Sequence, residues 1–241
     1  MPDADLSLAV PAIFFGAVGT AGQRCTSTRR LYLHRDIAPE VLSRLQKLYT
    51  TVKVGDPLAD STLLGPLHTE AALGVYDNAI KALRKTNAEI LTGGGRYEEG
   101  LLKDGNFVQP TIAIPKSSDT KQDIWATETF APILNAAIFD EVEQAIEWNN
   151  AVPQGLSSSI WTRDLRNVGK WIGPAGSDTG IVNVCDFPCP FSFVEPDRLL
   201  CEQVNVGTSG AEIGAAFGGN KVCLFVVPLP YVSNIWSTAL A

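Results

Sequence analysis

A cysteine that follows a short run of small residues is the side chain in this sequence best suited to covalent chemistry. The run Gly19-Thr20-Ala21-Gly22-Gln23-Arg24 leads into Cys25, and Thr26 and Ser27 follow it. A thiolate is the nucleophilic form of cysteine and a nearby cation favours it, so Arg24 makes Cys25 a candidate nucleophile. The competing interpretation is that Cys25 packs in the core, as free cysteines in apolar chains usually do. The residues alone leave both interpretations open.

The other cysteines and the histidines suggest no partner for this thiol. The cysteines are odd in number and lack paired metal-ligand spacing, which argues against a disulfide framework, against a metal site and for a reducing compartment. They are Cys25, Cys185, Cys189, Cys201 and Cys223. His34 and His68 lie in polar stretches and are expected at the surface. A cysteine-dependent acyl hydrolase is therefore disfavoured, because the sequence shows no general base for it.

The composition excludes several classes of protein. The 241 residues are 45% hydrophobic and 19% charged, which is enough to bury one large core. The net charge of -7 supplies no basic stripe, so neither nucleic acid nor a membrane surface is expected as a main partner. The first apolar stretch, 6–18, lacks the positive flank of a signal peptide and is too short to span a bilayer. We therefore expect a cytoplasmic protein, or a mitochondrial one if a longer form carries an upstream targeting segment.

Hydrophobic periodicity predicts helices that alternate with strands around this thiol. Helical spacing of apolar residues predicts helices over 41–52, 69–86 and 140–150. Short β-rich runs predict strands over 89–92, 107–112, 157–161 and 180–184. Such alternation is typical of an α/β fold with a mostly parallel sheet. The residues expected to face the core are Leu73, Val75, Tyr76, Ile80 and Leu83 in the second helix, and Val142, Ala145 and Ile146 in the third.

Two segments break this pattern. Residues 185–204 contain three prolines and follow a predicted strand, and the near copy of 182–184 at 204–206 indicates that they are an insertion. Residues 222–241 are apolar, contain prolines and show neither helical nor strand periodicity. We interpret this last segment as a divergent apolar tail.

Several motifs, taken in order, resemble those of the aldehyde dehydrogenase superfamily. The run Gly22-Gln23-Arg24-Cys25 resembles the superfamily's nucleophile motif, and 14–21 is similar to the antiquitin branch, whose members oxidise alpha-aminoadipic semialdehyde. The resemblance covers nearly all of 3–221 outside 185–204, and several ordered motifs are far more specific than any single one. The further landmarks are Gly55-Asp56-Pro57, Gly65-Pro66-Leu67, Gly105-Asn106-Phe107 with Pro110-Thr111, Glu128-Thr129-Phe130-Ala131-Pro132, Gly155-Leu156-Ser157-Ser158 and Phe217-Gly218-Gly219-Asn220-Lys221.

The resemblance implies roles in catalysis and in NAD binding. Cys25 would attack the aldehyde to form a thiohemiacetal, and its backbone N–H would be one of the donors to the oxyanion. Transfer of a hydride to NAD would then leave a thioester. Glu128 would hold the hydroxyls of the nicotinamide ribose, with Phe130 beside the same ring.

The resemblance also implies a substrate with a second charged end. Arg24 matches the antiquitin residue that receives the distal carboxylate of the semialdehyde, a task that suits a guanidinium. Backbone N–H groups of the loop at Ser209, Gly210 and Ala211 would share that carboxylate. Phe217 would form an aromatic wall of the substrate tunnel.

The same resemblance sets the expected domain organisation. Residues 1–221 would form an α/β aldehyde dehydrogenase catalytic domain, interrupted at 185–204 and lacking the upstream dinucleotide-binding domain and the water-activating glutamate. Family members are homo-oligomers, and their oligomerisation strand would fall where the tail 222–241 departs from the pattern. Two hypotheses follow. The chain is an NAD-dependent dehydrogenase of a small aldehyde, or it is a truncated, non-catalytic homologue that acts by interaction or not at all.

Overall fold

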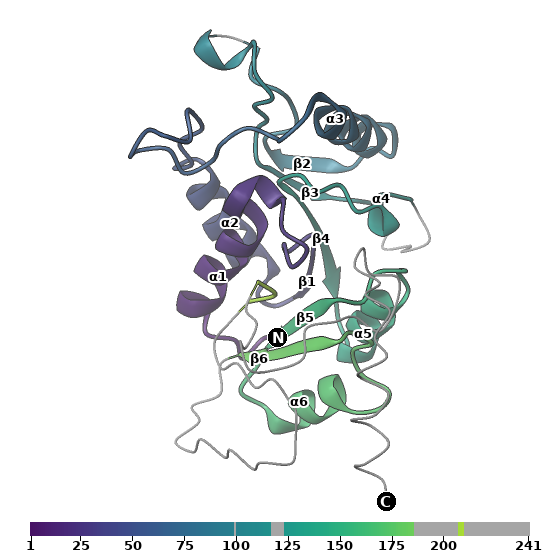
Figure 1. Ribbon diagram of the computed structural model, residues 1–241. Coiled ribbons are helices and arrows are strands. Elements are labelled where there is room, and N and C mark those ends of the chain that lie inside the picture. Colours follow the sequence, from purple (N-terminus) through teal and green to yellow (C-terminus); the bar gives the residue numbers. More distant parts are fainter. Residues whose placement is uncertain (99, 117–122, 186–206, 210–241) are drawn as a thin grey trace, which may run out of the picture.

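Two β-sheets with surrounding helices make up the computed structural model, which describes residues 1–98, 100–116, 123–185 and 207–209 (Figure 1). The larger sheet has the strand order β1-β4-β3-β2, and the smaller sheet pairs β5 with β6. The pairs β1–β4, β3–β4 and β5–β6 are parallel, whereas β2–β3 is antiparallel. The predicted mostly parallel α/β fold is therefore confirmed. The strands are β1 (Arg30–His34), β2 (Glu89–Thr92), β3 (Thr111–Ile114), β4 (Ile133–Phe139), β5 (Ser157–Trp161) and β6 (Ile181–Cys185).

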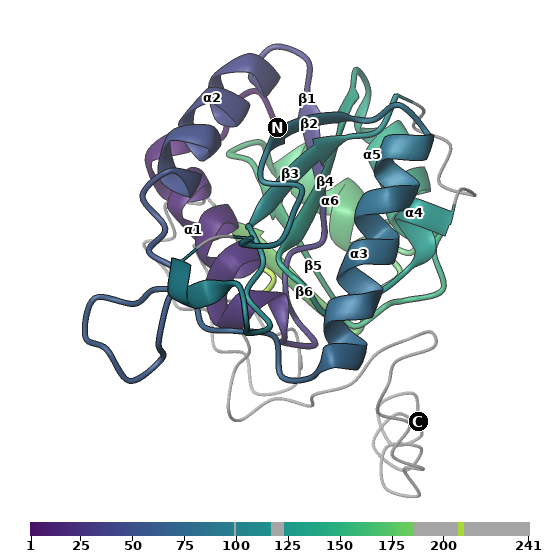
Figure 2. The same ribbon diagram turned by 90° about the horizontal axis from the view of Figure 1, so that it is seen from above.

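Helices cover both faces of the four-stranded sheet. In both views α1 and α2 lie on one face, and α3 and α4 lie on the other (Figures 1 and 2). A separate small core joins α5 and α6 to the two-stranded sheet through Val142, Ile146, Ile160 and Trp171. Within the described ranges, no helix is long and apolar enough to cross a bilayer. The helices are α1 (Leu6–Val18), α2 (Ala38–Tyr49), α3 (Glu70–Lys85), α4 (Asp123–Ala126), α5 (Val142–Asn150) and α6 (Leu165–Ile172), with short 3-10 turns η1 (Gly19–Gly22) and η2 (Gly100–Leu102).

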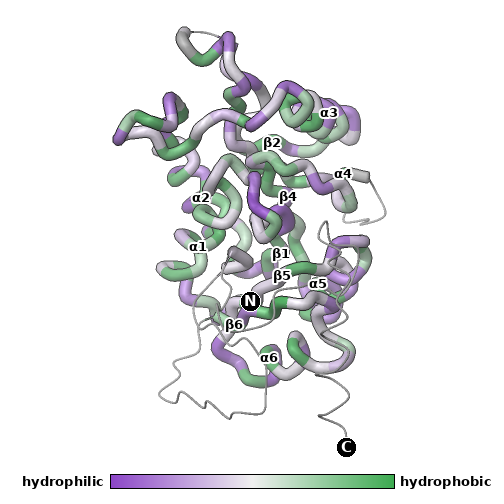
Figure 3. The backbone as a smooth tube through the Cα atoms, viewed as in Figure 1, coloured by the Kyte–Doolittle hydropathy of each residue, from purple (hydrophilic) through white to green (hydrophobic). Residues whose placement is uncertain are grey.

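Helix α3 follows closely from its sequence. The hydroxyl of Thr69 caps its start by accepting from the Ala72 N–H at 3.1 Å, and Glu70 complements the positive end of the helix dipole. Hydrophilic and hydrophobic segments alternate along its turns (Figure 3). Val75 is the exception to the prediction, because it lies about 100° around the helix from Tyr76 and is 41% exposed. The predicted core residues that are confirmed are Leu73, Tyr76, Ile80 and Leu83.

Several elements form where the sequence pattern did not predict them. Helix α1 contains Pro11, which normally breaks a helix, but Asp5 caps its start by accepting from the Ser7 N–H at 2.9 Å. Its all-round apolar composition also favours a buried helix. Strand β4 is buried on both faces for nearly its whole length, so its sequence shows no alternation. Strand β1 and helix α6 were also missed.

Three smaller predictions need correction. Strand β3 covers 111–114 rather than 107–112, because Pro110 has no N–H to donate to a ladder. Cys185 is the buried last residue of β6 and not the first residue of an insertion. The His34 side chain is only 19% exposed, since its ring packs edge-on against Phe139. The rest of the predicted insertion and the tail 222–241 lie outside the described residues.

Tyr76 joins α3 to the sheet through its hydroxyl. The hydroxyl lies 3.1 Å from the Gly95 carbonyl oxygen, 2.9 Å from that of Gln109 and 3.1 Å from Thr111 Oγ1. The side chain is fully buried. Burial raises the pKa of Tyr76 to about 12, because ionisation would place a charge in an apolar core.

We expect the free energy of unfolding to fall between pH 10 and pH 12. The phenol of the unfolded chain ionises from pH 10 upward, whereas folded Tyr76 stays neutral to about pH 12. For a buried tyrosine of this kind, each pH unit in this window lowers the free energy of unfolding by about 1.4 kcal/mol. The Tyr76→Phe variant should lose about 1 kcal/mol at neutral pH but show a shallower fall above pH 10. Urea unfolding of both proteins across this range measures the slopes, and equal slopes would contradict the prediction.

Candidate active site

Cys25 lies at the tip of a tight turn that follows helix α1. The Ser27 N–H donates to the Arg24 carbonyl at 3.2 Å, and the Arg24 N–H donates to Ser27 Oγ at 3.2 Å, so Cys25 and Thr26 form the tip. Among the described residues, none accepts a hydrogen bond from the Cys25 N–H. The Cys25 side chain is partly exposed, whereas Cys185 is buried. Both the thiol and the N–H can therefore meet a ligand.

The backbone just before this turn is strained. Thr20 and Ala21 have φ values of 52° and 54°, in the left-handed region that non-glycine residues rarely adopt. Such strain tends to be kept at functional sites. The side chain of Gln23 ties this segment to the landmark at Pro66, because it donates to the Pro66 carbonyl at 3.4 Å and accepts from the His68 N–H at 2.9 Å.

Gly22 brings the segment that contains Cys25 against the motif that contains Glu128. We call this segment, residues 22–27, the nucleophile turn after the role predicted for Cys25. A Cβ atom at Gly22 would lie 2.4 Å from the Ala131 carbonyl oxygen and 2.9 Å from the Pro132 nitrogen. The φ of Gly22 is +67°, which also favours glycine. Both the available space and the backbone conformation therefore require a glycine at this position. The Cys25 motif and the Glu128 motif, which are far apart in the sequence, are in contact here.

Arg29 links these two motifs, and the sequence analysis missed it. Its Nη2 donates to the carbonyl oxygens of Gly22 at 3.3 Å and Arg24 at 3.1 Å, and its Nε lies 3.5 Å from Glu128 Oε1. Its Cζ lies 4.6 Å from the centroid of the Phe130 ring. Burial lowers the pKa of the Arg29 guanidinium, and the Glu128 carboxylate opposes that change. Only its place shortly after the nucleophile motif could have drawn attention to it.

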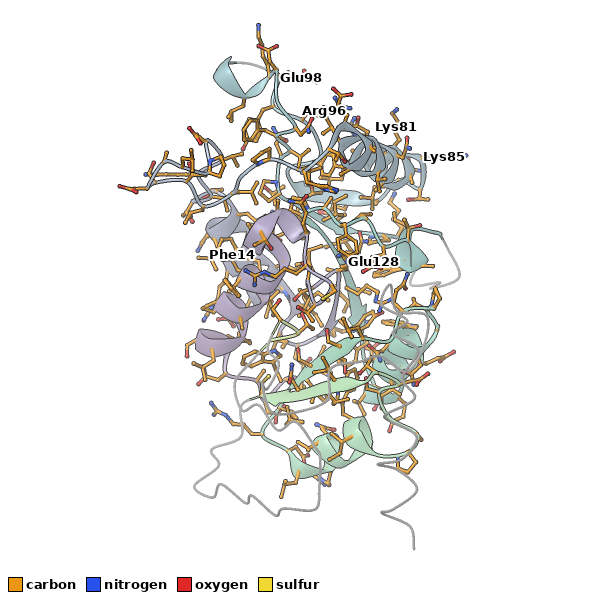
Figure 4. All side chains as sticks on the ribbon, in the orientation of Figure 1. Phe14, Lys81, Lys85, Arg96, Glu98 and Glu128 are labelled. Carbon is orange, nitrogen blue, oxygen red and sulfur yellow. The ribbon has the colours of Figure 1, made fainter. Side chains whose placement is uncertain are left out.

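Glu128 keeps part of its carboxylate available. Its Oε1 faces Arg29, and within the described chain no other side chain or backbone group pairs with the carboxylate. The Glu128 side chain is 21% exposed, and it lies toward the middle of the molecule while Lys81 and Lys85 lie at its periphery (Figure 4). A partly paired carboxylate in this position can accept hydrogen bonds from hydroxyl groups of a ligand.

Cys25 and Glu128 line the same cavity, which has a volume of about 690 Å³. Residues from β1 and β5 also line it, so strands of both sheets contribute to its wall. Its charged side chains are Arg29, Arg30 and Glu128, and most of the remaining wall is apolar or carries hydroxyl groups. A cavity of this size and character suits a small organic ligand or part of a larger one.

The described start of the predicted substrate loop lies beside the nucleophile turn. Thr208 Oγ1 is 2.7 Å from Thr28 Oγ1 and donates to the Thr26 carbonyl at 2.9 Å. Ser209 Oγ donates to the same carbonyl at 3.2 Å. The structure therefore places Ser209 against Thr26, the residue that follows Cys25. Gly210, Ala211 and Phe217 lie outside the described residues.

Arg24 does not share the cavity with Cys25. Its guanidinium lies over the ring of Phe15 in α1, with Cζ 4.9 Å from the ring centroid, and Arg24 is not among the residues of the cavity wall. Of the predicted residues, the structure thus brings Cys25 and Glu128 into one cavity and places Arg24 elsewhere. Among the described residues, the cation of the cavity wall that donates to carbonyl oxygens of the turn at Cys25 is Arg29.

The chain is similar in sequence to known proteins. Residues 1–191 match the aldehyde dehydrogenase family. The chain is 48% identical over 221 residues to aldehyde dehydrogenase family 7 member A1 of Pisum sativum, covering 92% of this chain and 38% of that one. It is 46% identical over 219 residues to alpha-aminoadipic semialdehyde dehydrogenase of Mus musculus, covering 91% and 36%. The chain therefore spans less than two fifths of the length of these relatives.

A solved structure shows the same fold. Betaine aldehyde dehydrogenase from Staphylococcus aureus, in complex with NAD+, aligns with a TM-score of 0.75 at 22% identity, covering 91% of this chain and 39% of that one. At this identity the likeness concerns the fold alone. The family match over residues 1–191 and the sequence identity to the two relatives lead to one assignment. The chain belongs to the aldehyde dehydrogenase family.

Proposed function

We propose that this chain carries the nucleophile site of an NAD-dependent aldehyde dehydrogenase, with Cys25 as the nucleophile and a semialdehyde as the substrate. The observation that carries the proposal is the shared cavity, in which the partly exposed Cys25 and the partly paired Glu128 meet. A nucleophile beside a ribose-binding carboxylate is the combination that oxidation of a covalently held aldehyde requires. The names of the two relatives support the same chemistry.

The residues of the turn suit the covalent step. The Cys25 sulfur would form a bond to the aldehyde carbon while the carbonyl π electrons move onto oxygen, giving a thiohemiacetal. The Cys25 N–H, which no described residue uses, can donate to that oxyanion. When bound, NAD supplies the hydride acceptor that turns the thiohemiacetal into a thioester. Glu128 is the residue that would hold its nicotinamide ribose, with Phe130 beside it.

The substrate's second charge would meet Arg24. The guanidinium is partly exposed and lies over the Phe15 ring, which limits its rotation while its edge stays free for a carboxylate. Ser209 and the loop residues after it would supply further donors, as the resemblance implies for Gly210 and Ala211, with Phe217 as an aromatic wall. The mouse relative is named for a semialdehyde that carries a distal carboxylate, which supports this substrate class.

We expect adipic semialdehyde to protect Cys25 from alkylation at about tenfold lower concentration than hexanal does. The two aldehydes have the same length, and only the first carries a carboxylate, whose charged hydrogen bonds contribute about 1.5 kcal/mol or more. Replacing Arg24 with Met should abolish the difference, whereas Arg44→Met, on the exposed side of α2, should keep it. Peptide mapping after limited treatment with iodoacetamide measures the protection.

A second measurement separates the two hypotheses for this chain. NADH formation with adipic semialdehyde would show that the chain completes the oxidation. Protection without NADH formation would mean that the nucleophile site is intact but that the chain acts as a truncated, non-catalytic homologue. If neither aldehyde protects Cys25 at any concentration, the proposed nucleophile is wrong.

A further inference from the structure

Arg29 is a charged side chain of the cavity wall that the reaction outlined above does not use. Its guanidinium makes contacts on three sides. Nη2 donates to two carbonyl oxygens of the nucleophile turn, Nε faces the Glu128 carboxylate, and one face of the group lies on the Phe130 ring. One side chain thus touches both the segment that carries the thiol and the motif that would hold the cofactor ribose.

Burying the charged groups of Arg29 and Glu128 costs free energy, because both lose contact with water. The side chains of Arg29 and Glu128 are only 15% and 21% exposed, and a buried ion pair often stabilises a fold no more than an apolar pair would. Moreover, Arg29 Nη1 is buried without a hydrogen-bond partner among the described residues. A side chain retained at this cost suggests a role in the geometry or the electrostatics of the site.

The shape of the guanidinium suits a geometric role. It is planar and can stack on an aromatic ring while its edge donates in fixed directions. Here the stacked face meets Phe130, whose φ of 46° is itself strained. The edge reaches the carbonyl oxygens of Gly22 and Arg24, on either side of Gln23 and just before Cys25. An ammonium group could supply the charge but not this set of directions.

We propose that Arg29 is a positioning residue that holds the nucleophile turn, and with it Cys25, in place against Glu128 and Phe130. This inference rests on the proposed role of Cys25. The other charged groups nearby do not fit as well. Arg24 lies over Phe15, and Glu128 is negative. Arg30 also lines the cavity but makes no contact with the turn's carbonyl oxygens in the described structure.

The first test compares two reactions of Cys25 in the full chain. Acylation by p-nitrophenyl acetate needs both the sulfur and the oxyanion donor of the turn, whereas alkylation by iodoacetamide needs only the sulfur. In Arg29→Gln and in Arg29→Lys, acylation should slow by about tenfold, because neither side chain holds the turn in the same way. Alkylation should stay within about twofold of the wild-type rate in both variants.

The second test measures the order of the turn itself. Hydrogen exchange of the peptide that covers 19–29 should be faster in both Arg29→Gln and Arg29→Lys, because neither side chain reproduces the stacked, forked contacts. Arg44→Met is the control and should change neither acylation, alkylation nor exchange in this peptide. Unchanged acylation or unchanged exchange in both Arg29 variants would overturn the positioning role.

Failure of this proposal and failure of the proposed function can be told apart. If adipic semialdehyde fails to protect the wild-type Cys25, the proposed function fails, while hydrogen exchange in the Arg29 variants still reports on Arg29. Equal changes in acylation and alkylation would indicate a merely structural defect and would count against the proposal. If Arg29→Gln folds poorly, Arg29→Lys, which keeps the charge, still tests the directional contacts.

Discussion

Cys25→Ser is expected to remove at least about 99% of the acylation of this chain by p-nitrophenyl acetate, because a serine hydroxyl without a base is a far weaker nucleophile than a thiolate. The ester acylates a nucleophilic thiol without a cofactor, so the reaction tests Cys25 whether or not the chain binds NAD. Stability should hardly change, since Cys25 lies partly exposed at the tip of a turn. Release of nitrophenolate in the first turnover measures the effect.

Cys185 offers the matched control for this experiment. It is the fully buried last residue of β6, so its thiol should not meet the ester in the folded protein. Replacing it with Ala should lower the free energy of unfolding by about 1 to 2 kcal/mol and leave the acylation rate unchanged. Replacement of Cys25 should therefore affect the reaction, and replacement of Cys185 should affect stability. Acylation that persists in Cys25→Ser but is lost in Cys185→Ala would contradict the assignment.

The motifs in the sequence singled out segments that the structure brings together around Cys25, while the roles of their residues stay predictions. Glycine spacing, the thiol and the Glu128 motif follow a family order, and the structure brings them together at one turn through Gly22, Gln23 and Thr28. The family resemblance predicts which distant segments lie in contact, whereas hydrophobic periodicity predicts only the local helix or strand. The helices 69–86 and 140–150 and the strands 89–92, 157–161 and 180–184 were also found, since each has a clear pattern and end signals.

Two of the elements that the sequence analysis missed, β4 and α1, share a physical cause. Strand β4 is buried on both faces and α1 is apolar all round, so neither shows the periodicity of an element with one solvent face. Arg29 was missed for a different reason. A lone arginine is most often a solvated surface residue, and only the folded chain shows that its guanidinium contacts Glu128, Phe130 and the nucleophile turn. The substrate-binding role of Arg24 stays a prediction, and only the folded chain shows that its guanidinium lies over the Phe15 ring.

A single methyl group at Gly22 is expected to destabilise the folded chain strongly. In Gly22→Ala, the new Cβ would lie 2.4 Å from the Ala131 carbonyl oxygen, a distance at which backbone atoms must move. The φ of +67° adds a cost of about 1 to 2 kcal/mol for any residue with a Cβ. We therefore expect the variant to lose at least about 2 kcal/mol of unfolding free energy. Acylation of Cys25 should also slow, since the turn and the Glu128 motif can no longer approach each other.

Gly74→Ala should have the opposite effect on stability and is the control for Gly22→Ala. Gly74 lies within helix α3, and a Cβ built there meets no atom within 4 Å. Alanine has a higher helix propensity than glycine, so Gly74→Ala should gain about 0.5 to 1 kcal/mol without changing the acylation of Cys25. Urea unfolding of the two variants and the wild type under one set of conditions shows whether each substitution raises or lowers the free energy of unfolding. If Gly22→Ala proved as stable as Gly74→Ala, the close contact between the nucleophile turn and Ala131 would not exist in solution, and the shared cavity of Cys25 and Glu128 would lose its main structural support.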